Sequence, residues 1–230
     1  LCPEVVHDFQ GAYRRLGDMQ GSTVRSSVPG TLAPVTGALN FLGEYDQLKN
    51  LNFKELHMDN VNGTGHAFRF DDGVQYITIE DSIIERYALA AYIKKRDGPR
   101  FDYQRGIKIR RNIIRNNLHQ GVLGGAPDME IVDNVFIDNG SNSWFDHGIY
   151  FGCGDPGDGR ECPQLISGNY VTGSSRDSNG NCYGSQIVAH GYSNGAVIEN
   201  NIVIEPDGYA TGYCYGIMMT ECCGQESVMT

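Results

Sequence analysis

The chain has 230 residues, with 18 Lys and Arg against 28 Asp and Glu, so its formal net charge at pH 7 is −10. This acidic balance argues against nucleic-acid binding, which depends on a basic surface, and no apolar run reaches the ~18 residues of a membrane-spanning helix. The 30 glycines are about twice the usual share of ~7%. They are scattered singly among Asn, Asp and Ser, which predicts a turn-rich fold.

The first 37 residues show the weakest pattern. Two short apolar stretches, residues 5–9 and 31–35, flank a loop through residues 21–30. We expect residues 1–37 to be irregular or to form early turns of the repeat that follows. Because the chain begins with Leu1 rather than Met, we also expect it to be part of a longer protein.

From residue 38 to residue 221 the sequence repeats one pattern: an apolar residue, two polar residues, often Asn, and then a β-branched or aromatic pair. Six repeats, spaced by 26, 30, 22, 35 and 32 residues, begin at Phe53, Ile79, Ile109, Ile131, Ile166 and Ile198. Four of them share the Asn, namely Asn112, Asn134, Asn169 and Asn201. Helical repeats need a sustained 3.6-residue period, which no window shows. Short strands with stacked Asn at sharp bends therefore predict an all-β parallel β-helix, a solenoid of about six to eight rungs.

A second strand follows each first strand. The aligned second strands begin at His66, Ala90, Gln120, His147, Tyr183 and Tyr215. Alternation along a strand predicts an outward row of aromatic, basic and amide side chains, comprising His66, Arg69, Tyr92, Lys94, Gln120, His147, Tyr150, Tyr183, Gln186, Tyr215 and Met218. Trp144, just before His147, is expected to add a platform at the edge of this row or to fill the corner.

The seven cysteines show no pair with the spacing of a zinc site. A disulfide between Cys153 and Cys162 could close a polar loop. Cys182 and Cys214 occur in identical Cys-Tyr-Gly triplets and predict either a second disulfide or a stack of free thiols. Two sequons, at Asn62 and Asn139, predict glycosylation in turns. These features favour an extracellular or cell-surface protein without a metal or cofactor.

Several segments resemble the rungs of right-handed parallel β-helix proteins of the pectate-lyase-like group. They are residues 43–53, residues 65–70, residues 76–82 and the His147-Gly-Ile-Tyr strand. The resemblance spans residues 38–221 and implies a right-handed solenoid in a group that includes polysaccharide lyases, glycosidases, epimerases and phage tailspikes. The lyase signatures, an acidic calcium cluster with a matching Arg motif, are not found. The resemblance therefore assigns no catalytic residue.

The outward row is the best candidate for chemistry. Tyrosine rings suit the C–H faces of sugars, and Arg or Lys would pair with acidic groups on a glycan. The residues expected to bind substrate are His66, Tyr92, Trp144, Tyr183, Gln186 and Tyr215. For a lyase, we expect His147 or Lys94 as the base, Arg69 to neutralise the carboxylate and Tyr150 as the acid. Hydrolysis would instead need two carboxylates, for which Asp146 and the pair Asp71 and Asp72 are the nearest candidates.

Two function classes follow. The first is an extracellular carbohydrate-active β-helix that binds, and cleaves in a lyase-like way, a polysaccharide or cell-surface glycan. The alternative is a structural or adhesive β-helix that associates end to end, because the sequence shows no capping segment. Residues 222–230 are then expected to be a tail or the start of a further rung.

Overall fold

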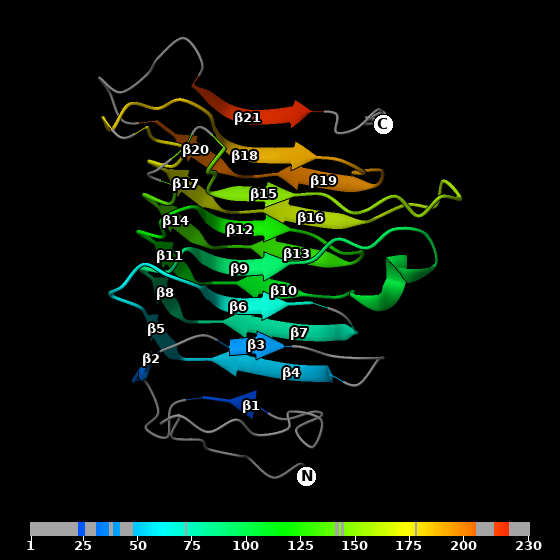
Figure 1. Cartoon of the computed structure of the whole chain (residues 1–230), viewed down its shortest axis with the longest axis horizontal. Coiled ribbons are helices and arrows are strands. Elements are labelled where there is room, and N and C mark those ends of the chain that lie inside the picture. The colour runs from blue at the N-terminus through cyan, green and yellow to red at the C-terminus, as the bar shows by residue number, and fades with distance from the viewer. Residues whose placement is uncertain are drawn as a thin grey trace.

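The computed structural model describes residues 23–25, 31–36, 39–41, 48–71, 73–140, 143, 145–177, 179–205 and 214–220. Their strands form three parallel sheets of seven strands each, which the chain visits in turn (Figure 1). The fold is therefore the predicted parallel β-helix. Trp144, Asp72, residues 1–22 and residues 222–230 lie outside the described residues.

The three sheets are called A, B and C in the order in which the chain reaches them. Sheet A contains β1 (Thr23–Val24), β4 (Leu48–Lys54), β7 (Val74–Glu80), β10 (Lys108–Arg110), β13 (Met129–Val132), β16 (Gln164–Ser167) and β19 (Ala196–Glu199). Sheet B contains β2 (Ala33–Thr36), β5 (Leu56–Asp59), β8 (Ile83–Glu85), β11 (Ile113–Arg115), β14 (Val135–Ile137), β17 (Tyr170–Thr172) and β20 (Ile202–Ile204). Sheet C contains β3 (Leu39–Phe41), β6 (His66–Phe70), β9 (Leu89–Ile93), β12 (Gln120–Gly124), β15 (Ile149–Phe151), β18 (Ser185–His190) and β21 (Tyr215–Thr220).

The repeat found in the sequence is the register of sheet A. The six predicted first residues are direct partners from strand to strand, from Phe53 in β4 to Ile198 in β19. All but Ile198 are at most 1% exposed, and they join one continuous apolar core inside the coil. Strands β1 and β2, within the segment expected to be irregular or early rungs, pair in parallel with β4 and β5.

The predicted Asn column lies at the corner between sheets A and B. Asn112 donates from both its backbone and its side-chain nitrogen to Asn134 Oδ1, each at 3.0 Å, and its amide nitrogen also donates to the Ile79 carbonyl. The same contacts join Asn134 to Asn169 and Asn169 to Asn201. The residue before each column position is left-handed, with φ between 52° and 68° at Glu55, Asp81, Arg111, Asp133, Gly168 and Asn200. The stacked amides thus satisfy the backbone of a tight corner.

A second ladder, which the sequence analysis missed, lies at the corner between sheets B and C. The Asn117 amide donates to Asn139 Oδ1 at 2.8 Å, and Asn139 donates to the Ile114 carbonyl at 2.8 Å. Asn139 is 0% exposed. The predicted glycosylation of Asn139 is therefore wrong for the folded chain, because its amide nitrogen already lies in the ladder. Asn62 is exposed in a turn, and its glycosylation stays a prediction.

The predicted register of sheet C needs two corrections. His66 pairs with Leu89 rather than Ala90, a shift of one residue. Ile149 pairs with Ile187, which places Ser185 rather than Tyr183 on the rung position of His147. The inner row is nevertheless continuous, and Phe68, Val122, Ile149 and Ile217 belong to it as expected.

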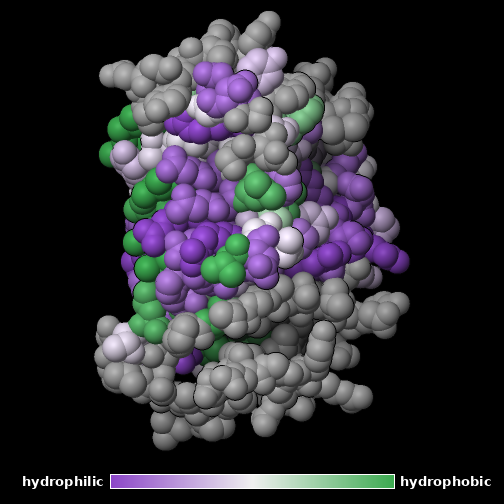
Figure 2. All heavy atoms as spheres, turned by 60° about the vertical axis from the view of Figure 1, so that its left-hand side comes forward, coloured by the Kyte–Doolittle hydropathy of each residue, from purple (hydrophilic) through white to green (hydrophobic). Residues whose placement is uncertain are grey.

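The outer face of sheet B bears an apolar row. Its members, direct partners in adjacent strands, are Ile83, Ile113, Val135, Tyr170 and Ile202. Figure 2, which turns this side of the molecule forward, shows apolar side chains in a line along the stack beside a broad polar surface. In the part of the chain that the structure describes, no helix is long and apolar enough to cross a membrane.

Candidate functional site

The outward row of sheet C runs along the stack on direct strand partners. Its central positions are Arg69, Tyr92, Leu123, Tyr150, Val188 and Met218. Adjacent rungs of a β-helix are ~4.8 Å apart, so side chains of neighbouring positions contact one another. We call these six positions the strip.

Tyr92 lies at the centre of one cluster on the strip. The His66 ring stacks on Tyr92 at 5.4 Å between ring centroids, and the Arg69 guanidinium lies over Tyr92 at 5.7 Å. Asp71, which is 8% exposed, accepts from Arg69 Nε at 2.9 Å. Burial, followed by the charge of Arg69, lowers the pKa of His66. The cluster thus combines a fixed cation with two aromatic rings.

Tyr150 lies at the centre of a second cluster of the same kind. The His147 ring stacks on Tyr150 at 5.9 Å, and Lys95 Nζ lies 4.9 Å from the centroid of the Tyr150 ring. The ring of His190 meets Tyr150 edge to face at 5.1 Å. Lys95 also donates to the His190 carbonyl at 2.7 Å, which holds the ammonium in place. Lys95 and His190 were not among the residues predicted to act here, since neither belongs to the sequence repeat.

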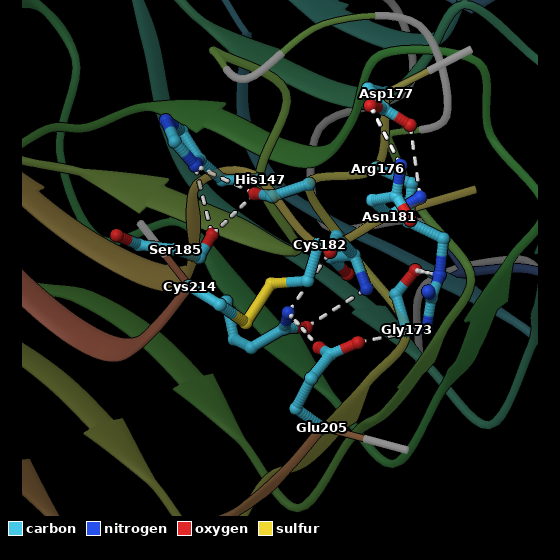
Figure 3. The surroundings of a disulfide bond; sticks show 12 residues. His147, Gly173, Arg176, Asp177, Asn181, Cys182, Ser185, Glu205 and Cys214 are labelled. Carbon is cyan, nitrogen blue, oxygen red and sulfur yellow. Dashed lines mark hydrogen bonds and ion pairs between the residues drawn. A yellow bond between two sulfur atoms is a disulfide. The ribbon is translucent and has the colours of Figure 1, made fainter. Parts of the chain in front are cut away.

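His147, predicted as a base, is only 4% exposed. Its Nδ1 lies 2.8 Å from the Ser185 carbonyl oxygen and 3.0 Å from Ser175 Oγ, so Nδ1 holds the proton that the carbonyl accepts (Figure 3). Burial lowers the pKa of His147 to about 4. The imidazole is therefore neutral at pH 7 and is a weak base.

The residues predicted for lyase chemistry do not all converge. His147 and Tyr150 lie together, whereas Arg69 is three rungs from Tyr150, about 14 Å along the stack. Lys94 follows the last residue of β9 and is half-buried, while its neighbour Lys95 contacts Tyr150. Arg69 cannot neutralise the same carboxylate that Tyr150 contacts.

The carboxylates predicted for hydrolysis also lie apart. Asp71 follows β6 and Asp146 precedes β15, so at least three rungs, about 14 Å, separate them. A hydrolytic pair requires at most ~9.5 Å. Asp146 Oδ2 instead lies 3.3 Å from His119 Nδ1. The expected hydrolytic pair is therefore not formed by these two residues.

The predicted substrate-binding residues differ in how far their side chains are exposed. Tyr215, in β21, is 47% exposed, and Tyr183 is 38% exposed in the loop before β18. Gln186 is only 1% exposed and bonds to the backbone of Ser174 and to Glu205. Alternation still places Gln186 on the same side of β18 as Val188 of the strip, but Ser174 and Glu205 cover its amide, so it does not reach the surface.

Two disulfides connect the pairs expected from the sequence. Cys153–Cys162 closes a loop at one edge of sheet C, and Cys182–Cys214 joins adjacent rungs at the other edge (Figure 3). Disulfides form in oxidising compartments. Glu205 lies beside the second disulfide, paired with Arg176 at 2.9 Å, and burial raises its pKa.

Two groups of described side chains outside the strip bring three ligand atoms together as a metal site would, and one of them is the disulfide-bonded Cys182 and Cys214 with Glu205. His57, Asp59 and Glu85 on sheet B offer ligand atoms within 4.8 Å of one another. Glu85 already contacts His57 Nε2 at 2.7 Å and Arg115 at 2.6 Å, and Asp59 pairs with Arg86. These contacts account for the group as an ion-pair network on a sheet face.

Comparison with known proteins gives one structural likeness. No family model matches this chain, and neither does any curated protein. A solved structure, the crystal structure of the Agl-KA catalytic domain, superimposes with a TM-score of 0.53 at 15% sequence identity and covers 86% of this chain. The likeness shows the fold. The match covers 36% of that chain, so this chain corresponds to about a third of its length.

Proposed function

We propose that this protein is a carbohydrate-active β-helix that binds a polysaccharide along the strip on sheet C. The observation that supports this most directly is the pair of Tyr–His–cation clusters on one continuous outer face. Aromatic rings offer apolar contact to sugar rings, and fixed N–H donors offer hydrogen bonds to hydroxyl and acidic groups. The similar solved structure is described as a catalytic domain, which agrees with a ligand-binding solenoid.

Loops at both edges of sheet C would confine such a chain. After β9 and β15, residues 94–107 and 152–163 leave sheet C on the side of sheet A, and they include the 3-10 helix η2 (Gly98–Tyr103). Asp155 N donates to Asp97 Oδ1 at 2.8 Å, so the two loops contact each other. The corner with Cys182 and Cys214 borders the opposite edge. An extracellular setting would give both disulfides an oxidising environment and the strip access to glycans.

Binding is tested by titrating the full chain with a panel of linear glycans in a calorimeter. Tyr92→Ala and Tyr150→Ala should each weaken binding about tenfold, which corresponds to the loss of ~1.4 kcal/mol of ring contact. Tyr170→Ala is the matched control, since Tyr170 is a partly exposed tyrosine on the outer face of sheet B. Equal losses for all three variants would contradict a site on the strip.

Cleavage by β-elimination is a second candidate function, supported by the position of Lys95 at 4.9 Å from the Tyr150 ring. Tyr150, as phenolate, would take the proton α to a uronate carboxylate, Lys95 would pair with that carboxylate, and the leaving oxygen would take its proton from solvent. A conjugated, ultraviolet-absorbing uronate would form. Tyr150→Phe should then abolish product formation while binding remains within about threefold. Product formation by Tyr150→Phe at the parent rate would exclude Tyr150 from the step.

Self-association is the alternative supported at the end of the described stack. In β21 the inner-row residue Ile217 is 48% exposed and Met219 is 41% exposed. Sedimentation velocity over a hundredfold concentration range tests this alternative. Concentration-dependent association that Ile217→Ser abolishes would support it, and a single monomer boundary at every concentration would contradict it.

A further inference from the structure

Tyr76 has a backbone conformation that large side chains rarely adopt. It lies in β7, on sheet A between β4 and β10 (Figure 1). Its φ is 57°, in the left-handed region, where the side chain crowds the neighbouring backbone and costs free energy. Among the described residues other than glycine with positive φ, Tyr76 is the only aromatic one. Strained residues of this kind cluster at sites that bind ligands.

The stack requires the left-handed bend at this position but does not require a tyrosine. The register places Tyr76 opposite Asn50 in the rung before and Gly106 in the rung after, and Asp128 follows one rung later. All four residues have φ between 57° and 65°, and the Tyr76 nitrogen donates to the Arg105 carbonyl at 2.9 Å. Asn, Asp and Gly tolerate this conformation best. The same bend could therefore be built with Asn at position 76.

The Tyr76 ring leans over Gly106 and remains open to water. A Cβ atom at residue 106 would lie 2.6 Å from Cδ1 of Tyr76, so only glycine leaves room for the ring there. Tyr76 is nevertheless 46% exposed. The ring is thus held against backbone on one side and accessible on another.

The charged groups beside the ring are paired with one another. Arg105 Nε donates to Asp128 Oδ2 at 3.1 Å, and Arg105 Nη1 lies 3.6 Å from Asp102 Oδ1. Lys108 in β10 likewise donates to Glu130 in β13 at 2.7 Å. An accessible ring among compensated charges suits a ligand that has an apolar face and no net charge. The C–H face of an uncharged sugar has this chemistry.

We propose that Tyr76 is the platform of a second sugar-binding site, separate from the strip, for an uncharged sugar of a linear glycan. One sugar ring lies against the Tyr76 ring, and one of its hydroxyl groups accepts from Arg105, whose guanidinium has five N–H donors. Sheet A and sheet C are different faces of the coil, so the two sites are occupied independently. The second site does not rest on glycan binding at the strip.

The binding test titrates three uncharged hexasaccharides, cellohexaose, xylohexaose and laminarihexaose, into the full chain in a calorimeter. The background is the Tyr92→Ala/Tyr150→Ala double variant, which removes the ring contacts of the strip. At least one hexasaccharide should still bind, and Tyr76→Ala in this background should weaken it about tenfold. Tyr76→Phe, which keeps the ring, should bind within about threefold of the background. Tyr170→Ala on sheet B is the matched control and should have no effect.

The outcomes separate the second site from the strip. If none of the three hexasaccharides binds the double variant, or if Tyr76→Ala changes nothing, the second site is wrong, whether or not the parent chain binds through the strip. If the parent chain and the double variant bind equally and only Tyr76→Ala weakens binding, the second site stands and glycan binding along the strip is wrong. Circular dichroism verifies that each variant is folded.

The strained backbone gives a second test that does not depend on any ligand. A residue kept for contact with a ligand should be replaceable without loss of stability. Because Asn tolerates the left-handed conformation, Tyr76→Asn should have a urea midpoint of unfolding at or above that of the parent chain. Tyr170→Asn, in strand β17, should lower the midpoint, because Asn is disfavoured in strands. A comparable fall in Tyr76→Asn would show that the fold itself needs the ring and would overturn its assignment to a ligand.

Discussion

His147 illustrates how burial changes the chemistry available to one residue. The sequence analysis places His147 in the outward row together with Tyr150 and therefore predicts an accessible base. In the structure the imidazole is 4% exposed and donates from Nδ1 to the Ser185 carbonyl. A carbonyl that accepts this proton is satisfied by the neutral imidazole, and burial penalises the charged form. His147 therefore positions the Tyr150 ring rather than exchanging protons near pH 7.

The low pKa of His147 makes stability depend on pH. The unfolded chain binds a proton at this histidine near pH 6.5, whereas the folded chain binds it only near pH 4. The free energy of unfolding should therefore be unaffected by this group above pH 7 and fall by on the order of 3 kcal/mol as the pH is lowered from 6.5 to 4. Urea unfolding at half-unit pH steps measures this slope. His147→Gln should reduce it, while His119→Gln should leave it intact, and an unchanged slope in His147→Gln would contradict the buried neutral form.

At the scale of single elements, the corners at the two ends of the sheet B strands are built in the same way. Each three-residue strand in β11 and β14 lies between ladder positions five residues apart, Asn112 and Asn117 in one rung and Asn134 and Asn139 in the next. In all four cases a left-handed residue precedes the Asn, as at Arg111 and Asn116. Sheet B is therefore held at both edges by buried amides.

A buried ladder amide should be expensive to remove. Asn134 Oδ1 accepts from two nitrogens of Asn112, and Asn134 Nδ2 donates to the Ile109 carbonyl. Asn134→Ala leaves these buried groups without partners and should lower the free energy of unfolding by about 2–4 kcal/mol. Asn62→Ala, at an exposed turn, should change it by less than about 0.5 kcal/mol. Guanidinium unfolding of the two variants measures this difference. Similar midpoints of unfolding for Asn134→Ala and Asn62→Ala would show that the ladder contributes little to stability.

The sequence predicts the elements that lie at a fixed distance from the Asn ladder. Sheet A strands end at the corner and sheet B strands begin directly after it, so their register can be counted from Asn112, Asn134 and Asn169. Sheet C strands follow loops of different length: Gln120 comes 3 residues after Asn117, whereas Ser185 comes 11 residues after Ser174. Counting fails across such loops, which accounts for the errors at Ala90 and Tyr183.

The candidate site is predictable to the same extent. The outward positions of Arg69 and Tyr150 follow from alternation within strands whose register was correctly predicted, whereas Tyr92 becomes the partner of Arg69 only after the one-residue shift at Leu89. The contact between Lys95 and His190 joins residues 95 positions apart, and it depends on how a loop folds back over the sheet. The second ladder had a local signal, since Asp138-Asn139 repeats Asp133-Asn134 five residues later. The sequence analysis instead assigns Asn139 to a glycosylation sequon, because Gly140 and Ser141 follow it.

At the scale of the whole molecule, the two disulfides differ in the length of chain that they close. Cys182–Cys214 closes a separation of 32 residues and Cys153–Cys162 one of 9 residues. Because restriction of the unfolded chain increases with loop length, replacing the first pair by Ala should cost about 3.5 kcal/mol and replacing the second about 2.5 kcal/mol. Urea unfolding of the two double variants tests the order. A larger loss for the shorter loop would show that contacts of the Cys153–Cys162 loop with η2, rather than loop length, determine its contribution.

A solenoid is stabilised by contacts between neighbouring rungs, so a core position should matter most where rungs lie on both sides. Ile149 and Ile217 occupy the same inner row of sheet C, but Ile149 is 0% exposed and Ile217 is 48% exposed. Ile149→Ala removes buried methyl groups from a packed interior and should cost about 2–5 kcal/mol. Ile217→Ala should cost less than half as much, because its side chain is already half in water and the remaining rungs are unaffected. Hydrogen exchange should show the same gradient, with slow amides in β12 and β15 and faster ones in β21. Equal destabilisation by the two variants would mean that Ile217 is covered in solution, as end-to-end association would produce.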